Sequence, residues 1–327
     1  MPTTDTTSPI TNEQPRRRPT VLVMMATYNG AAYVREQIES VLTQHEVDVT
    51  LRICDDQSPD DTFAICQEYE AKDPRVHATR NEQNLGVGEN FMQMVYDDGS
   101  RGYDYYAFCD QDDIWLPEKL IVAITKISHL MNPTEPTLYY SDVIDFDGER
   151  EWRELGPFKP CEEHPATLLL NNWASGCTMV FNQALRDLLC RYRPKPLPRI
   201  HDSWTHLVAR YCGTVVADLS YSGIRRRITG NNVVGSLTDH HKSPLGAWND
   251  FKNLFFRPER AMTRAAAELA IGFADRIKQE RAEELYEFLS YHDTPLSCIK
   301  AAFCFDCYRP TLYGKALFML RFALGRF

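Results

Sequence analysis

Three carboxylates crowd into four consecutive positions at the end of an apolar segment. The segment Tyr105–Cys109 is aromatic and apolar, and Asp110, Asp112 and Asp113 follow it. Like charges held this close repel one another, so a compensating positive charge is expected beside them. Oxygen ligands of this kind suit Mg²⁺ or Mn²⁺, and such ions commonly also hold the phosphates of a substrate. The alternative for a bare Asp-x-Asp sequence is an acidic turn exposed to water.

Other apolar segments also end in polar loops. Apolar runs predict strands at Thr20–Ala26, Val47–Cys54 and Arg75–Ala78, each followed by a segment with helical spacing. This alternation predicts an α/β fold with a mostly parallel, doubly wound (Rossmann-like) sheet. In such sheets ligands bind beyond the carboxyl ends of the strands. The loops expected at that edge carry Thr27, Asn29, Asp55, Asp56, Asn84, Gly86, Asp110 and Asp112.

The same periodicity divides the chain into three regions. Residues 1–18 are rich in Thr, Pro and Arg and are expected to be disordered. Residues 19–240 form the predicted catalytic domain, with a nucleotide-binding half at 19–115 and an acceptor half at 116–240. Residues 241–327 form a helical region, in which 249–293 is expected to be long, charged and helical.

Composition narrows the possible partners. A net charge of −9 over 327 residues argues against nucleic-acid binding, which requires a concentrated basic face. The ten cysteines are scattered and no secretory signal precedes them, so we expect reduced thiols in a cytoplasmic protein. No apolar run is long enough to span a bilayer.

The C-terminal segment differs from the rest of the chain. Residues 296–327 carry five basic residues and one acidic residue, a local charge of +4 (five minus one) among many apolar side chains. A basic amphipathic tail is typical of peripheral contact with anionic lipid. The alternative is a terminal helix that packs on the catalytic domain.

The ordered set of motifs resembles a known family. The motifs are Ala26–Gly30, Asp55-Asp56-x-Ser58-x-Asp60, Asn84–Gly86, Phe108–Trp115, Ser175-Gly176, His201-Asp202 and Asn231–Gly235. Together they resemble an inverting family-2 glycosyltransferase of GT-A fold, in its bacterial rhamnosyltransferase-like branch.

The resemblance implies a role for each matching residue. Asp202 would be the catalytic base, and Asp112 would be the direct ligand of Mg²⁺ or Mn²⁺, with Asp110 beside it. The residues implied in nucleotide-sugar binding are Thr27, Tyr28, Asn29, Asp55, Asp56, Asn84, Gly86, Asp110, Gln111, Gly176 and Arg227. Those implied in acceptor contact or support are Asp113, Trp115, Trp173, His201 and Trp204.

Each role has a structural alternative. Asp202 could instead cap the helix that follows it, a position that Asp favours. Trp115, Trp173 and Trp204 could pack in the core, and His201 could orient the neighbouring carboxylate. One position departs from the branch, because Thr229 stands where a histidine is usual and a hydroxyl is a poorer metal ligand.

The resemblance implies a transferase that moves L-rhamnose from dTDP-rhamnose onto a lipid-linked or polysaccharide acceptor. It would act in bacterial cell-surface glycan synthesis at the inner face of the membrane. A UDP-hexose donor and a non-catalytic sugar-nucleotide-binding relative remain alternatives. A sugar-1-phosphate nucleotidyltransferase is a further alternative, but it should open with a Gly-rich loop, and this loop has Gly30 alone.

Overall fold

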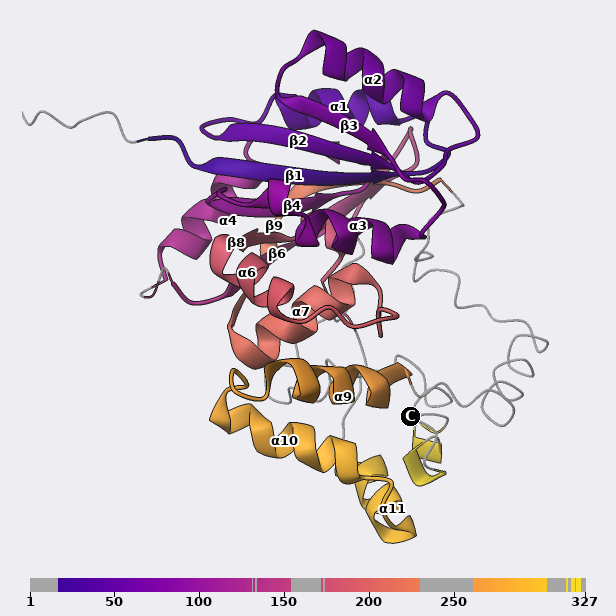
Figure 1. Ribbon diagram of the computed structural model, residues 1–327, viewed down its shortest axis with the longest axis vertical. Helices are drawn as coiled ribbons and strands as arrows, with labels where there is room; N and C mark the ends of the chain where they lie inside the picture. The colour runs from indigo at the N-terminus through magenta and orange to yellow at the C-terminus, as the bar shows by residue number, and fades with distance from the viewer. Residues whose placement is uncertain are drawn as a thin grey trace, which may run out of the picture.

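A single mixed sheet organises the chain. The computed structural model describes residues 17–130, 132, 134–153, 172, 174–229, 261–304, 316, 319–320 and 322–324. Within these residues nine strands pair in the order β3-β2-β1-β4-β8-β6-β9-β5, and β7 pairs with β6 (Figure 1). The strands are β1 Thr20–Thr27, β2 Asp48–Asp55, β3 Val76–Arg80, β4 Tyr105–Cys109, β5 Ile114–Trp115, β6 Thr137–Phe146, β7 Glu151–Trp152, β8 Val180–Asn182 and β9 Thr214–Arg227.

Helices cover both faces of the sheet. They are α1 Val34–Leu42, α2 Thr62–Lys72, α3 Val87–Tyr96, α4 Lys119–Ser128, α6 Gln183–Arg191, α7 His201–Cys212, α9 Ala261–Phe273, α10 Gln279–Ser290 and α11 Pro295–Cys304. Along β1, Val21 and Val23 pack in the core with α1, α2 and α4, whereas Leu22 and Met24 pack in the core with α3, α6 and α7. Because alternate side chains of a strand face opposite sides, a strand buried on both faces must be apolar throughout.

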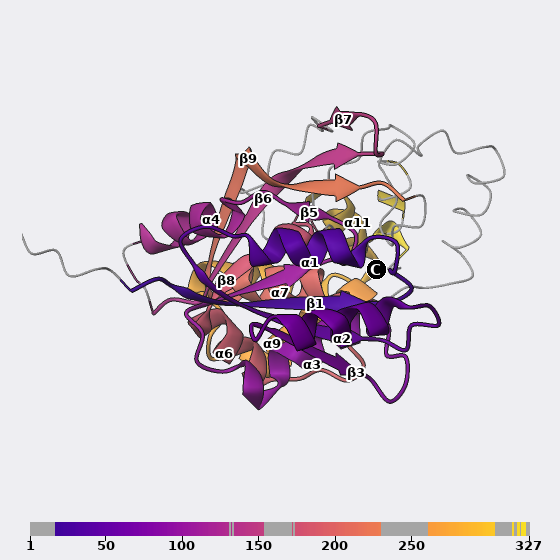
Figure 2. The same ribbon diagram turned by 90° about the horizontal axis from the view of Figure 1, so that it is seen from above.

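The α/β fold class is confirmed, and the second half of the sheet adds antiparallel strands. β1, β2, β3 and β4 are parallel, whereas β8 runs antiparallel to both β4 and β6. β9 runs parallel to β6, and the two strands lie side by side in Figure 2. The carboxyl ends of β1, β2, β4, β6 and β9 therefore meet the amino end of β8 at one edge of the sheet.

The C-terminal helices extend the core beyond α7. α9, α10 and α11 lie on the far side of α6 and α7 from the sheet (Figure 1), and their apolar side chains join the same cluster as α3 and α7. The stretch 249–293 is mostly helical where the structure describes it, and it is divided into two helices, because α9 ends at Phe273 and α10 begins at Gln279. No described helix is both long and apolar enough to cross a membrane.

Candidate functional site

Side chains from other loops hold the turn after β1. The backbone N–H of Asn29 donates to Ser58 Oγ (3.0 Å), that of Gly30 to Thr62 Oγ1 (2.8 Å), and that of Ala31 to Asp60 Oδ2 (3.0 Å). The backbone N–H of Tyr28 donates to Gln111 Oε1 (2.9 Å). These four consecutive donors are therefore engaged within the protein.

A loop of this kind does not cradle phosphate. Phosphate-binding turns offer free backbone N–H groups to the anion, and here residues 28–31 already donate theirs. This arrangement disfavours the nucleotidyltransferase alternative. The side chains of Tyr28 and Asn29 remain exposed above the held backbone.

Asp55 is buried in a network of hydrogen bonds at the end of β2. Thr27 Oγ1 donates to its Oδ1 (3.1 Å), and the Ser58 backbone donates to its Oδ2 (3.0 Å). Arg80 Nε also lies 3.2 Å from Oδ2. The carboxylate therefore fixes the loops around β1 and β2, and a direct contact with ribose stays a prediction.

Asp56 organises the loop that leads into α3. Its Oδ1 accepts from the Leu85 backbone and its Oδ2 from the Gly86 backbone, both at 2.8 Å. Asn84 donates back to the Asp56 carbonyl (2.8 Å). Gly86 has a positive φ of 79°, which glycine adopts readily. It is also the residue before α3, so the Asp56 carboxylate lies at the electropositive amino end of that helix.

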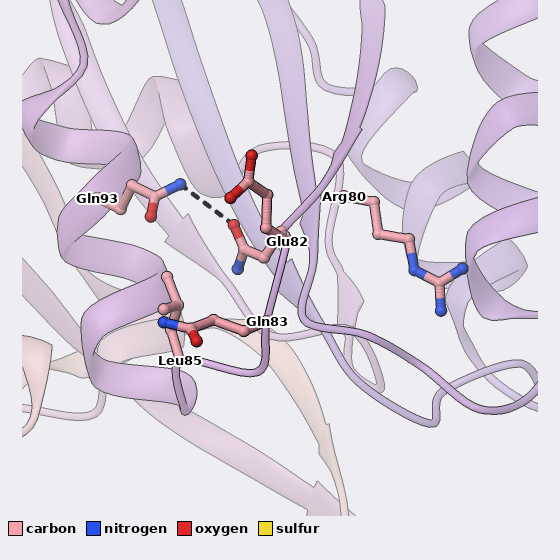
Figure 3. A pocket seen from close by; sticks show the side chains of 6 residues that line it. Arg80, Glu82, Gln83, Leu85 and Gln93 are labelled. Atoms are coloured by element: carbon pink, nitrogen blue, oxygen red, sulfur yellow. Dashed lines mark hydrogen bonds between the residues drawn. The ribbon is translucent and has the colours of Figure 1, made fainter.

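A cavity of about 610 Å³ lies beside this loop. Figure 3 shows the side chain of Gln93, from α3, pointing toward the loop that carries Glu82, and Gln93 Nε2 donates to Asn81 Oδ1 (3.1 Å). The residues that line the cavity are Arg80, Asn81, Glu82, Gln83, Leu85 and Gln93. It thus offers amide, carboxylate and guanidinium groups at the carboxyl ends of β2 and β3.

The carboxyls after β4 lie close together and have raised pKa values. Burial raises the pKa of Asp110 well above its usual range, and the charges of Asp113, Asp112 and Asp202 raise it further. Burial also raises the pKa of Asp113 to about 7 and raises the pKa of Asp112. Asp202 comes from a distant part of the sequence, so its effect on Asp110 places the two carboxylates in one neighbourhood.

These carboxylates fit a hard divalent cation. Their mutual repulsion would be relieved by positive charge, and carboxylate oxygens are the ligands that Mg²⁺ and Mn²⁺ prefer. Asp113 Oδ2 is buried and receives no N–H or O–H donor among the described residues. Potential ligand atoms of Asp110, Asp113 and Cys177 lie within 4.8 Å of one another, a grouping that the sequence did not suggest.

Asp202 lies in the first turn of α7, and the N-cap is Ile200. The alternative in which Asp202 caps the helix is therefore wrong. Burial raises the pKa of its carboxyl, while hydrogen bonding from the Ser203 and Gly176 backbones opposes the rise. Gly176 lies so close to α7 that a Cβ there would be 2.7 Å from His201 Nε2. Because β8 runs antiparallel to β4, residues 176–178, which precede β8, lie at the carboxyl end of β4.

His201 is an aromatic core residue beside the acidic edge. Its ring stacks on Phe91 (centroids 4.0 Å apart) and meets Phe108 edge-on (4.8 Å). Both ring nitrogens lack a hydrogen-bond partner among the described residues, and burial lowers its pKa to about 3. The imidazole is therefore neutral, and the expected orienting bond to Asp202 is not formed.

Arg227 connects β9 to the acidic loop. Its backbone N–H donates to Asp113 Oδ1 and its Nε to the Asp112 carbonyl, both at 3.1 Å. Its guanidinium also pairs with Glu36 (2.6 Å). The neighbouring Arg226 pairs with the buried Asp145 (2.6 Å). Positive charge thus stands beside the carboxylates, and acids that the sequence did not single out hold it in place.

Two of the tryptophans are core residues. Trp115 and Trp204 are buried in opposite clusters, so both support the fold and neither faces solvent. Lys119 Nζ lies 3.7 Å from the Trp115 ring centroid, in a helix that the sequence did not predict. Trp173 and the 231–235 motif lie outside the described residues.

The comparisons with known proteins agree with this geometry. The model of glycosyl transferase family 2 matches residues 22–185, which is half of the chain and includes the loop that carries Asp110–Asp113. The chain belongs to glycosyl transferase family 2.

Curated relatives match shorter stretches. The chain is 40% identical over 102 residues to the dTDP-rhamnosyl transferase RfbG of Shigella flexneri, covering 31% of this chain and 35% of that protein. It is 33% identical over 183 residues to the UDP-Glc:alpha-D-GlcNAc-diphosphoundecaprenol beta-1,3-glucosyltransferase WfgD of Escherichia coli, covering 55% of this chain and 65% of that one. The match thus spans under two thirds of either relative.

Solved structures show the same GT-A fold at low identity. Residues 1–349 of TarS from S. aureus, in complex with UDP-GlcNAc, match with a TM-score of 0.52 and 14% identity over 93% of this chain and 89% of that one. The mannosyltransferase PcManGT from Pyrobaculum calidifontis, in complex with GDP-Man and Mn²⁺, matches with a TM-score of 0.54 and 12% identity over 95% and 88%.

Proposed function

We propose that the protein transfers a sugar from a nucleotide donor to a glycan acceptor with inversion of configuration, assisted by Mg²⁺ or Mn²⁺. The observation that carries the proposal is the gathering of Asp110, Asp112, Asp113 and Asp202 at one sheet edge. Burial raises the pKa of all four acids, and the charges of neighbouring acids raise those of Asp110 and Asp113 further. Such a cluster is destabilising unless a cation compensates it. Family membership makes a donor diphosphate the natural partner of that cation.

Each part of the edge takes one task in this proposal. Asp112 and Asp110 hold the ion, which when bound neutralises charge on the departing diphosphate. The exposed Tyr28 and Asn29 face the nucleotide, and the cavity lined by Asn81 and Gln93 accommodates its polar groups. Asp55, Asp56, Asn84 and Gly86 shape that half of the site. Gly176 lets its backbone approach α7 closely, beside Asp202 and the sugar.

Asp202 acts as the general base. In-line transfer with inversion needs one carboxylate opposite the leaving group, to accept the proton of the acceptor hydroxyl. A carboxyl whose pKa is raised by burial is a stronger base once ionised. Arg227, held against the Asp112 carbonyl, lies where it can attract the diphosphate.

The favoured donor is dTDP-rhamnose, on the strength of the identity to RfbG. A UDP-hexose is the second candidate, because the match to WfgD extends over more of the chain. In either case the acceptor is a lipid-linked or polysaccharide glycan of the bacterial surface, and the protein works peripherally at the inner face of the membrane.

A transfer assay with dTDP-rhamnose and UDP-hexoses, with and without Mn²⁺, tests the proposal. We expect turnover with one donor and loss of turnover in Asp112→Asn and Asp202→Asn, both folded. Transfer at the wild-type rate in either variant would show that the roles are wrong. Release of pyrophosphate from a nucleoside triphosphate would instead revive the nucleotidyltransferase.

A further inference from the structure

The side chain of Gln111 binds the backbone of Tyr28 at both of its polar groups. Gln111 Oε1 accepts from the Tyr28 N–H (2.9 Å), and Gln111 Nε2 donates to the Tyr28 carbonyl (2.8 Å). The backbone pairing of β1 with β4 ends at Met25 and Cys109. The amide of Gln111 therefore extends the contact between the two strand ends into the loops that follow them.

Gly30 leaves the space that this contact needs. A Cβ at Gly30 would lie 2.2 Å from Gln111 Oε1 and 2.4 Å from its Cδ. Atoms cannot approach so closely, so any side chain at Gly30 displaces the Gln111 amide. Gly30 does not have a positive φ, and alanine would therefore be tolerated by its backbone.

The held backbone presents an exposed aromatic ring. The Tyr28 side chain is 51% exposed although it adjoins the buried Thr27. An exposed ring on a loose loop is mobile, and fixing its backbone lowers the entropy that is lost when a flat ligand stacks on it. Because Gln111 lies between Asp110 and Asp112, the same residue connects this ring to the acidic loop.

We propose that Gln111 is a positioning residue that fixes the Tyr28 backbone, so that the Tyr28 ring offers a preorganised stacking face to the nucleobase of the donor. Gln111 thus acts on the nucleotide through Tyr28 and makes no direct contact with the sugar. The inference rests on the proposed function, because it requires a nucleotide donor.

Two substitutions from different loops break the same contact. Gln111→Met keeps the size of the side chain and removes both hydrogen bonds, and Gly30→Ala displaces the amide sterically. Calorimetric titration of dTDP and UDP in the presence of Mn²⁺ measures the effect. We expect each variant to weaken the binding of its nucleotide about tenfold, within the range for loss of base stacking on an aromatic ring.

The double variant distinguishes positioning from general damage. If both changes act through one contact, Gln111→Met with Gly30→Ala binds no more than about twofold worse than either single variant. Tyr28→Ala should match them in affinity while the thermal midpoint stays at the wild-type value. The control is Gln67→Met, the same change at an exposed glutamine of α2, which should bind as wild type.

Three outcomes would overturn the inference. Wild-type affinity in Gln111→Met would show that the contact does not serve binding, and the proposed function would stand. If the fold-loss of nucleotide affinity in the double variant equals the product of the two single losses, the two residues act separately. If the wild-type protein binds neither nucleotide, the proposed function fails and the inference fails with it.

Discussion

At the scale of single residues, burial opposes the ionisation of the carboxyls that follow β4. Asp113 accepts one backbone hydrogen bond from Arg227, yet its second oxygen is buried without an N–H or O–H donor among the described residues. Burial therefore outweighs the stabilising contacts and raises the pKa of Asp113 to about 7. Such a carboxyl binds a proton more tightly in the folded chain than in the unfolded chain.

This raised pKa predicts how stability depends on pH. Between about pH 4 and pH 7 the folded protein holds a proton on Asp113 that the unfolded chain has lost, so the contribution of Asp113 to stability falls as pH rises. Asp113→Asn has no titrating carboxyl at this position. Its free energy of unfolding relative to wild type should therefore rise by about 2 kcal/mol from pH 5 to pH 7.5, since one pKa unit corresponds to about 1.4 kcal/mol.

Urea denaturation of both proteins without metal, at the two pH values, measures this difference. The comparison with Asp113→Asn is needed because the buried His201 and His206, with pKa values lowered to about 3, have the opposite pH dependence in both proteins. A free-energy difference that is the same at pH 5 and pH 7.5 would refute the assignment.

Asp202 allows a separate test of catalysis. Asp202→Asn removes the proposed base and a buried charge together, so we expect transfer to fall by about 10²- to 10⁴-fold with stability unchanged or raised. Nucleoside diphosphate binding should persist. Asp98→Asn, at an exposed acid paired with Arg101, is the control and should transfer at the wild-type rate. Equal activity of the two variants would exclude Asp202 as the base.

At the scale of elements, the helices that carry the site are fixed at their ends by buried polar contacts. Arg186 on α6 is buried and donates to the Val95 carbonyl (3.1 Å) and the Asp97 carbonyl (2.7 Å) at the end of α3. The Asp97 carbonyl also accepts from the Ser100 N–H (3.0 Å) and the Val95 carbonyl from Cys190 Sγ (3.5 Å). The guanidinium adds a charged donor to both carbonyls and complements the helix dipole. The orientation of α3 in turn sets the loop that Asp56 holds.

Arg186→Met should therefore lower the free energy of unfolding by about 2–3 kcal/mol, because two hydrogen bonds from a buried, charged guanidinium are lost. Arg191→Met on the same helix removes only an exposed pair with Asp275 and should change it by less than about 1 kcal/mol. Chemical denaturation of both variants measures this contrast. Similar losses in the two would show that α3 does not depend on Arg186.

At the scale of the whole molecule, the features that could be predicted from the sequence are those that depend on the burial of a single segment. The first strands and the edge with Asp55 and Asp110 were predictable because segments buried on both faces are apolar throughout and end abruptly in polar loops. α4 was not predicted, since it follows the acidic motif in one apolar stretch. The antiparallel β8, which brings Gly176 to Asp110, depends on pairing between distant segments that periodicity cannot reveal.

The described part of the C-terminal region packs on the domain and also exposes apolar side chains. Phe322 is buried against Phe288 and Tyr291, whereas Leu320 and Leu324 are exposed. On α11, Leu296 is 76% exposed and Ile299 is 49% exposed. The region thus packs on the domain and still offers apolar side chains beside a basic sequence, as the proposed membrane contact requires.

Leu296→Ser with Ile299→Ser should weaken binding to phosphatidylglycerol vesicles by roughly tenfold or more, given the area that two apolar side chains bury. Ile271→Ser, at an apolar side chain of α9 that is 70% exposed, is the matched control and should bind normally. Vesicle sedimentation measures both. Unchanged binding in the α11 variant would mean that α11 does not contact lipid.

The central claim is that acids distant in sequence gather around one cation and the diphosphate it neutralises. A crystal structure with Mn²⁺ and a nucleoside diphosphate, with the metal located by anomalous scattering, tests it most directly. The account predicts one metal peak bound by Asp112 or Asp110 and by the diphosphate, with Asp202 facing the same cleft. A diphosphate bound elsewhere, or no metal at the Asp110–Asp113 loop, would contradict it.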